Sequence, residues 1–227
     1  MTQPASAPEA RTQAENLDLL ADVAVNIGLG LKPGQELVMT ASLDSVALAR
    51  RITEHAYRAG ASLVTTLFND EESALLRYRH APDASFDHAA KWLYDGMAAA
   101  FKSGAARMAI AGSNPALLAG QDPAKVARAN VAASKAAKPA MELITRHEIN
   151  WTIVASATPE WAKLVFPNEP AEQAVAKLWE AIFAASRITG DDPVADWLAH
   201  GRLPILIEQT VRVAPLVRMS PDGKRFV

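Results

Sequence analysis

Residues 151–167 read Trp-Thr-Ile-Val-Ala-Ser-Ala-Thr-Pro-Glu-Trp-Ala-Lys-Leu-Val-Phe-Pro and combine a strand, a turn and a helix start. The uncharged, β-branched run from Trp151 to Ala155 is typical of a strand inside a sheet. Thr158 and Pro159 predict a helix, because threonine caps a helix with its side-chain oxygen and proline suits the first helical position. Phe166-Pro167 ends that helix, since a residue before proline avoids the α region.

Three earlier apolar segments share this strand pattern, namely 37–40, 62–68 and 108–111. Residues with helical spacing separate them, so strands and helices alternate along the chain. Short uncharged strands between amphipathic helices predict an α/β fold. We expect a mostly parallel sheet of about four or more strands with helices on both faces, in a Rossmann-like three-layer arrangement.

The predicted helices are bounded by turn residues and caps. Gly60 is expected to end the helix after the first strand, and Ser42 or Asp44 to cap its start. The predicted ranges are 15–27, 44–60, 71–79, 86–103, 122–137, 171–188 and 192–200.

Composition limits the classes of function. The 227-residue chain is 50% hydrophobic and can bury a core. Its net charge is −2 and its Lys and Arg residues are scattered, which argues against nucleic-acid binding. The absence of cysteine excludes disulfides and thiolate metal ligands and is compatible with a cytoplasmic location. No apolar run has the length of a transmembrane helix, so no membrane partner is expected.

The glycines Gly28, Gly30 and Gly34 follow a predicted helix and lead into a strand. A dinucleotide-binding fingerprint has the opposite order, in which a strand precedes the glycines and a helix follows them. These glycines therefore predict the end of a helix and a turn rather than a phosphate-binding loop.

The histidines and serines form no recognisable catalytic pattern. No pair among the histidines has the H-E-x-x-H spacing that places two imidazoles on one helix face. No serine lies in a G-x-S-x-G elbow or near an interpretable histidine and acid. The residues considered are His55, His80, His88, His147, His200, Ser42, Ser62, Ser113 and Ser156.

The acidic group Asp70-Glu71-Glu72 follows the second predicted strand. Three carboxylates are able to bind a hard cation. We favour a structural interpretation, in which the acids stabilise the positive N-terminus of a helix. The group nevertheless lies at the carboxyl edge of the sheet, where α/β domains place ligands.

Several segments together resemble the N-terminal domain of the M29 metallo-aminopeptidases, the thermophilic-type aminopeptidases. The segment 151–167 is the most specific, and the others follow the family's order and spacing from Leu17 to His200, about four-fifths of the chain. They are Leu31-Lys-Pro-Gly-Gln35, Ala56-Tyr-Arg-Ala-Gly-Ala61, Arg77-Tyr-Arg-His-Ala-Pro82, Ile110-Ala-Gly-Ser-Asn-Pro115, Leu178-Trp179 with Ile182, and Asp192-Pro-Val194 with Trp197 and His200.

This resemblance implies cytoplasmic, dimeric enzymes that remove N-terminal residues from peptides. It implies two divalent metal ions per active site, such as zinc, cobalt or magnesium, which activate a water molecule. It also implies that the metal ligands lie in the C-terminal half of the family. No catalytic, cofactor-binding or metal-binding residue is therefore assigned in this chain.

The resemblance ends at His200. The tail, 201–227, breaks the helix with Gly201-Arg-Leu-Pro204 and continues through apolar, β-prone residues that favour aggregation. We interpret it as out-of-frame sequence after a frameshift, with a genuine short form as the alternative. The expected organisation is a disordered lead-in over 1–14, an M29-like N-terminal α/β domain over 15–200, and a non-family tail without the catalytic metal-binding domain.

The main expectation is a truncated metal-dependent aminopeptidase that forms a homodimer and is inactive alone. The alternative is a non-catalytic α/β interaction module that pairs with full-length subunits. A third hypothesis is a nucleotide- or small-ligand-binding domain that uses the strand ends near Asp70 and Ser113, and fold analogy alone supports it.

Overall fold

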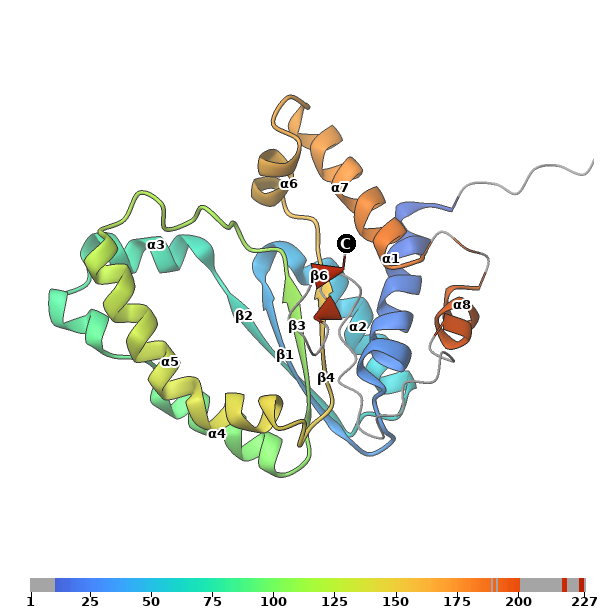
Figure 1. The fold of residues 1–227 in the computed structure, drawn as a ribbon, viewed down its shortest axis with the longest axis horizontal. Helices are drawn as coiled ribbons and strands as arrows, with labels where there is room; N and C mark the ends of the chain where they lie inside the picture. The colour runs from blue at the N-terminus through green and yellow to red at the C-terminus, as the bar shows by residue number, and fades with distance from the viewer. Residues whose placement is uncertain (1–10, 189, 191, 201–217, 220–224, 227) are drawn as a thin grey trace, which may run out of the picture.

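The computed structural model describes residues 11–188, 190, 192–200, 218–219 and 225–226. At its centre lies a parallel four-stranded sheet with the strand order β2-β1-β3-β4 (Figure 1). The strands are β1 (Glu36–Ser42), β2 (Leu63–Asn69), β3 (Ala106–Ala111) and β4 (Trp151–Ala155). All of the predicted strands form, and the predicted α/β class with a parallel sheet is confirmed.

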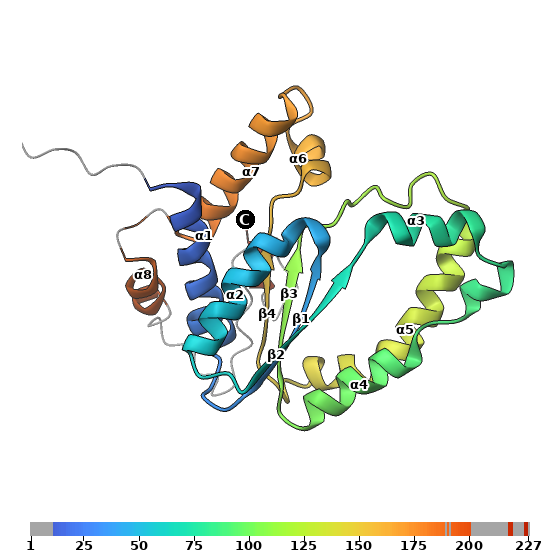
Figure 2. The same cartoon turned by 180° about the vertical axis from the view of Figure 1, so that it is seen from behind.

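Helices cover both faces of this sheet (Figures 1 and 2). The first face carries the larger core, in which Leu37, Met39 and Met108 are completely buried. It packs against α1 (Gln13–Asp22), the π-helix η1 (Val23–Leu29) and α2 (Val46–Arg58), and α2 follows the short 3-10 helix η2 (Leu43–Ser45). The second face packs against α4 (Lys91–Lys102) and α5 (Pro123–Thr145).

Among the described helices, α4 and α5 cover the second face near the starts of the strands. Val38, near the start of β1, is 7% exposed beneath α4 and α5. Ile153, farther along β4, is 37% exposed. On the first face, by contrast, Thr152 of the same strand is completely buried. The second face is therefore more exposed at Ile153 than beneath α4 and α5.

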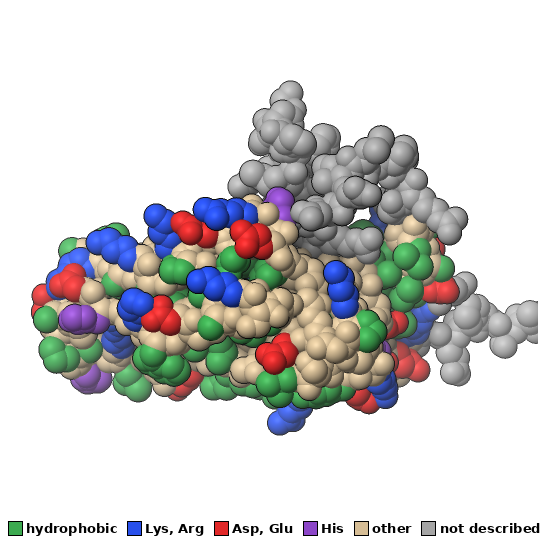
Figure 3. Space-filling view, turned by 90° about the horizontal axis from the view of Figure 1, so that it is seen from below, with side chains coloured by type: hydrophobic (Ala, Val, Ile, Leu, Met, Phe, Trp, Pro, Cys, Tyr) green, Lys and Arg blue, Asp and Glu red, His purple; other side chains and the backbone are tan. Residues whose placement is uncertain are grey.

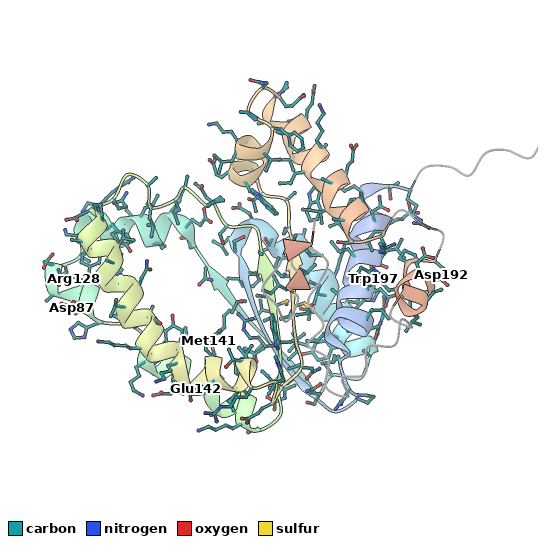
Figure 4. All side chains as sticks on the ribbon, in the orientation of Figure 1. Asp87, Arg128, Met141, Glu142, Asp192 and Trp197 are labelled. Atoms are coloured by element: carbon teal, nitrogen blue, oxygen red, sulfur yellow. The ribbon has the colours of Figure 1, made fainter. Side chains whose placement is uncertain are left out.

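An arm extends from the sheet on the side of β2. It consists of α3 (Glu71–His80), the 3-10 helix η3 (Asp83–Asp87) and the start of α5 (Figure 4). Phe86, which is completely buried, lies under Arg77 and Lys125, with ring-to-charge distances of 5.4 and 5.3 Å. Arg128 binds Asp83 and Asp87 at 2.8 and 2.6 Å. Cation–π contacts and ion pairs thus hold the arm together.

The remaining helices are α6 (Pro159–Val165), α7 (Ala171–Ala185) and α8 (Pro193–His200). The indole Nε1 of Trp197 donates a hydrogen bond to the carbonyl of Ser186 at 2.8 Å and ties α8 to the end of α7 (Figure 4). A short antiparallel pair, β5 (Arg218–Met219) with β6 (Arg225–Phe226), follows. The rest of the predicted tail, like residues 1–10 of the predicted lead-in, lies outside the described residues.

Several predicted boundaries are wrong. The helix predicted to start at Phe86 starts at Lys91, because Phe86 is held in the arm's core within η3. The helix predicted to end at 137 continues through Pro139 to Thr145. The first helix starts at Gln13, inside the predicted lead-in, since Thr12 and Glu15 form a reciprocal capping box.

Candidate functional site

The carboxyl edge of the sheet is the candidate site. The chain leaves β1 toward β2 on one side and reaches β3 on the other, so β1 and β3 flank the topological switch point. Parallel α/β sheets bind ligands outside the strand ends at such a point. The loops that meet there begin near Ser42, Asp70, Gly112 and Ser156 (Figure 1).

The loops after β3 and β4 are in direct backbone contact. The N–H of Ser156 donates to the carbonyl of Ala111 at 2.7 Å. A Cβ atom on Gly112 would lie 2.3 Å from the carbonyl oxygen of Ser156, so only glycine fits. The buried hydroxyl of Thr158 donates to the carbonyl of Gly112. The prediction that this side chain caps α6 is therefore wrong, because its hydroxyl ties two loops together instead.

The acidic group begins α3. One carboxylate oxygen of Asp70 accepts from the N–H of Glu72 at 3.1 Å, and the other accepts from the hydroxyl of Ser73 at 2.6 Å. The Ser73 hydrogen bond, together with the backbone donors, holds the pKa of Asp70 below its ordinary value against a smaller effect of desolvation. Glu71 accepts from the N–H of Asn114 at 2.8 Å. These contacts support the structural interpretation of the acids as a helix start.

The carboxylates at this edge do not form a metal-binding cluster. Among the described residues, no group of three or more His, Asp or Glu side chains could hold a metal ion. Asp70 accepts a hydrogen bond from Glu72 in the helix that it caps, whereas Glu71 accepts one from Asn114 in the loop after β3. The residues here therefore do not fit the pair of metal ions that the M29 resemblance implies, and no metal-dependent step is derived from them.

The serines and histidines are not brought together. Ser42 and Ser45, both buried, share a hydrogen bond of 3.0 Å at the end of β1. His80 ends α3 and His88 follows η3, while His147 has a positive φ of 59° in the turn before β4. In the described part of the chain, no hydrogen bond joins a serine side chain to a histidine side chain. The side chain of His200 lies outside it.

Sequence reasoning missed a charged cluster between α1 and α2. The Nε2 atom of His55 lies 3.1 Å from Asp18, and its Nδ1 atom lies 3.4 Å from Asp22. Arg51 also contacts Asp18 at 3.4 Å. Burial raises the pKa of Asp18. The contacts with His55 and Arg51 lower it by more than burial raises it, so the pKa lies below its ordinary value. The i, i+4 spacing of the two aspartates is the only signal in the sequence.

The glycine-rich segment behaves as predicted. Gly30 adopts a left-handed conformation with φ of 60° at the end of η1, and Gly34 has φ of 80° in the turn before β1. The interpretation as a helix end and a turn is confirmed.

A surface depression is present away from the carboxyl edge of the sheet. It has a volume of about 430 Å³ and sits over α1 and α2, not at the carboxyl edge. Its lining residues are Arg11, Ala14, Glu15, Asp18, Leu19 and Arg51. These side chains include both signs of charge, and Arg51 and Asp18 pair with each other. We therefore keep the sheet edge, which fold geometry favours, as the candidate site.

The fold and its edge define a doubly wound α/β domain whose strand-end loops are tied to one another. The family model described as thermophilic metalloprotease (M29) matches residues 13–207, and the chain belongs to this family. The match starts at 13 rather than at the predicted 15 and ends at 207 rather than at 200.

The relatives carry aminopeptidase names. Aminopeptidase T of Thermus thermophilus is 50% identical over 187 residues, which are 82% of this chain and 46% of that protein. Aminopeptidase AmpS of Bacillus subtilis is 37% identical over 187 residues, with the same shares covered. The solved structure of wild-type AmpT from Thermus thermophilus superposes with a TM-score of 0.79 at 48% identity, over 84% of this chain and 47% of that one. The chain spans about half the length of these relatives.

Proposed function

We propose that this chain forms the N-terminal α/β domain of a metal-dependent aminopeptidase, an enzyme that removes N-terminal residues from peptides. The observation that carries the proposal is the continuous similarity to Aminopeptidase T, at 50% identity over 187 residues. The agreement of the fold with AmpT, at a TM-score of 0.79, supports it.

The chemistry of this proposal requires residues beyond the described ones. In the enzymes that the M29 resemblance implies, two divalent ions supply an activated water molecule. The described carboxylates form no metal cluster, and those at the sheet edge hold loops together. We therefore propose a scaffolding role for this domain and no peptide cleavage by the 227-residue chain alone. An assay of amino-acid release from a leucyl peptide with added metal ions tests this.

A second candidate is a non-catalytic module that pairs with full-length subunits, or with itself as a homodimer. The observation in its favour is the exposed apolar surface on α3 and on the neighbouring parts of β2 and α4. None of the residues of α3 is buried, and Leu76, Phe68 and Trp92 are 49%, 43% and 77% exposed. Such apolar surface is typical of interfaces. Size-exclusion chromatography of the chain with and without a full-length M29 relative tests this, and separate elution at all concentrations would exclude it.

Nucleic acid and membranes are not part of the proposal. On the face drawn in Figure 3, Lys and Arg side chains alternate with Asp and Glu, and the net charge is −2. No helix among the described residues has the length and apolarity needed to cross a membrane. The cytoplasmic location belongs to the proposal, and the cysteine-free sequence supports it. Titration with nucleotides tests the third hypothesis, which needs binding at the ends of β2 and β3, near Asp70 and Ser113.

A further inference from the structure

Arg107 of β3 and Trp151 of β4 are direct neighbours on the second face of the sheet. The two residues are register partners across the β3–β4 ladder, and Arg107 is also the partner of Val38 in β1. Register partners in adjacent strands project to the same face. Val38 and Trp151 both belong to the cluster beneath α4 and α5, which places this row on the second face.

Among the described residues, neither side chain has a hydrogen-bond acceptor. The indole Nε1 of Trp151 is buried and has no partner. Within the described part of the chain, the guanidinium of Arg107 makes no hydrogen bond and no ion pair, and burial lowers its pKa. Indole N–H and guanidinium groups donate only. Buried polar groups in folded proteins are almost always paired, so the buried indole N–H of Trp151, next to the partly exposed Arg107, indicates a missing acceptor.

The surroundings of the pair are apolar and open on one side. Ala109 and Ile153 form the next row along β3 and β4, and Ile153 is 37% exposed. Met141 of α5, which is 44% exposed, lies between α5 and the strands in the view of Figure 4. A group that enters from the carboxyl half of the sheet would thus cross apolar side chains before it reaches the two donors.

This environment selects a ligand chemistry. A carboxylate offers two acceptor oxygens, and guanidinium recognises it with a planar fork of N–H groups. One guanidinium balances one negative charge, which favours a carboxylate over a doubly charged phosphate. The apolar approach favours a carboxylate with an apolar substituent over a small inorganic anion.

We propose that Arg107 and Trp151 form a binding site for the carboxylate of an apolar C-terminal amino-acid residue, as in a peptide or a released amino acid. Arg107 binds the charge, the Trp151 indole donates the second hydrogen bond, and Ile153 contacts the apolar side chain. The assignment to peptide ends rests on the proposed function. The inference of a carboxylate site depends only on the two donors, Arg107 and Trp151, and not on the proposed function.

The test is isothermal titration of the 227-residue chain with N-acetyl-leucine, N-acetyl-leucinamide, inorganic phosphate and the tripeptide Leu-Gly-Leu. The carboxylate probe is expected to bind at least about tenfold more tightly than the amide, because a charge-assisted hydrogen bond is lost in the amide. Phosphate is expected to bind more weakly than N-acetyl-leucine. Arg107→Leu and Trp151→Phe are each expected to weaken carboxylate binding about tenfold, whereas the exposed Arg79→Leu in α3 is the matched control and leaves it unchanged.

Any different result of the titration overturns a specific part of the proposal. Equal binding of N-acetyl-leucine and its amide, or unchanged binding by folded Arg107→Leu and Trp151→Phe, overturns the carboxylate site. Tighter binding of phosphate overturns the choice of ligand. Binding of N-acetyl-leucine without binding of Leu-Gly-Leu overturns the peptide assignment and leaves the carboxylate site in place. None of these readouts depends on peptidase activity, so failure of the proposed function is distinguished from failure of the site.

Discussion

Glu71, in the first turn of α3, accepts a hydrogen bond of 2.8 Å from the backbone N–H of Asn114, in the loop after β3. β2 and β3 are not adjacent, because β1 lies between them. The Glu71 side chain therefore joins loops from opposite sides of the switch point. The Glu71 carboxylate, which the sequence suggests as a possible metal ligand, instead joins the loops after β2 and β3 through a hydrogen bond.

Replacement of Glu71 by Ala is expected to lower the free energy of unfolding by about 1 kcal/mol, because the N–H of Asn114 loses its acceptor. Glu71→Gln keeps an acceptor oxygen and is the matched control, with a smaller loss. Urea unfolding measures both. Zinc or cobalt titration of wild type and Glu71→Ala should give the same weak response; a specific metal site lost only in Glu71→Ala would contradict the structural role.

Gly112→Ala is expected to destabilise the protein by about 2 kcal/mol or more, since its Cβ would lie 2.3 Å from the carbonyl oxygen of Ser156. Gly96→Ala is the matched control. Gly96 lies inside α4 with nothing within 4 Å of an added Cβ, so alanine there should stabilise by about 0.5–1 kcal/mol through helix propensity. Equal effects of the two substitutions in urea unfolding would show that the β3 and β4 loops do not touch as described.

Asp18→Asn tests the pH dependence of the α1–α2 contact. Burial raises the pKa of Asp18, but His55 and Arg51 lower it more, so its pKa in the folded protein lies below the ordinary value of 3.8. A carboxyl group with a lowered pKa stabilises the fold above its unfolded pKa, and this stability is lost as pH falls through the folded pKa. The stability difference between wild type and Asp18→Asn should be full at pH 5 and shrink below pH 4. A difference that stays constant from pH 5 to pH 2 would disprove the contribution.

Phe86→Ala is expected to cost about 3 kcal/mol, because it empties a completely buried site in the arm and removes the ring beneath Arg77 and Lys125. Trp92→Ala provides the comparison, since that aromatic side chain is 77% exposed and should cost little in the isolated chain. Hydrogen exchange should place the Phe86→Ala loss in α3 and η3. A loss spread evenly over β1 to β4 would argue against a separately stabilised arm.

The strands and the parallel sheet were predictable because their uncharged apolar runs have no other stable environment. Helix boundaries were predictable only where local signals decide them, as at Asp122-Pro123, where Asp122 accepts from the N–H of Ala124. The start of α4 was not, because Phe86 is held by Arg77 and Lys125, which are distant in sequence from each other. The continuation of α5 past Pro139 likewise depends on burial of Ala140, Leu143 and Ile144 beneath the sheet.

The candidate site was predictable only as a position. The order of strands and acids places Asp70 at the carboxyl edge, but the partners of these side chains depend on loop contacts that leave no periodic signal. Thr158 follows the rule for a helix cap and still bonds to Gly112, since the β3 loop passes within reach. The unpaired donors of Arg107 and Trp151 become visible only when the β3–β4 register is known.

The most direct test of the proposed function is an aminopeptidase assay on the purified 227-residue chain. A leucyl peptide is incubated with the chain and with zinc, cobalt or magnesium in turn, and a full-length M29 aminopeptidase serves as the positive control. The account predicts amino-acid release by the control and none above the blank by this chain, because its described residues form no metal cluster. Release of leucine by the chain alone, abolished by a chelator and restored by metal, would contradict it.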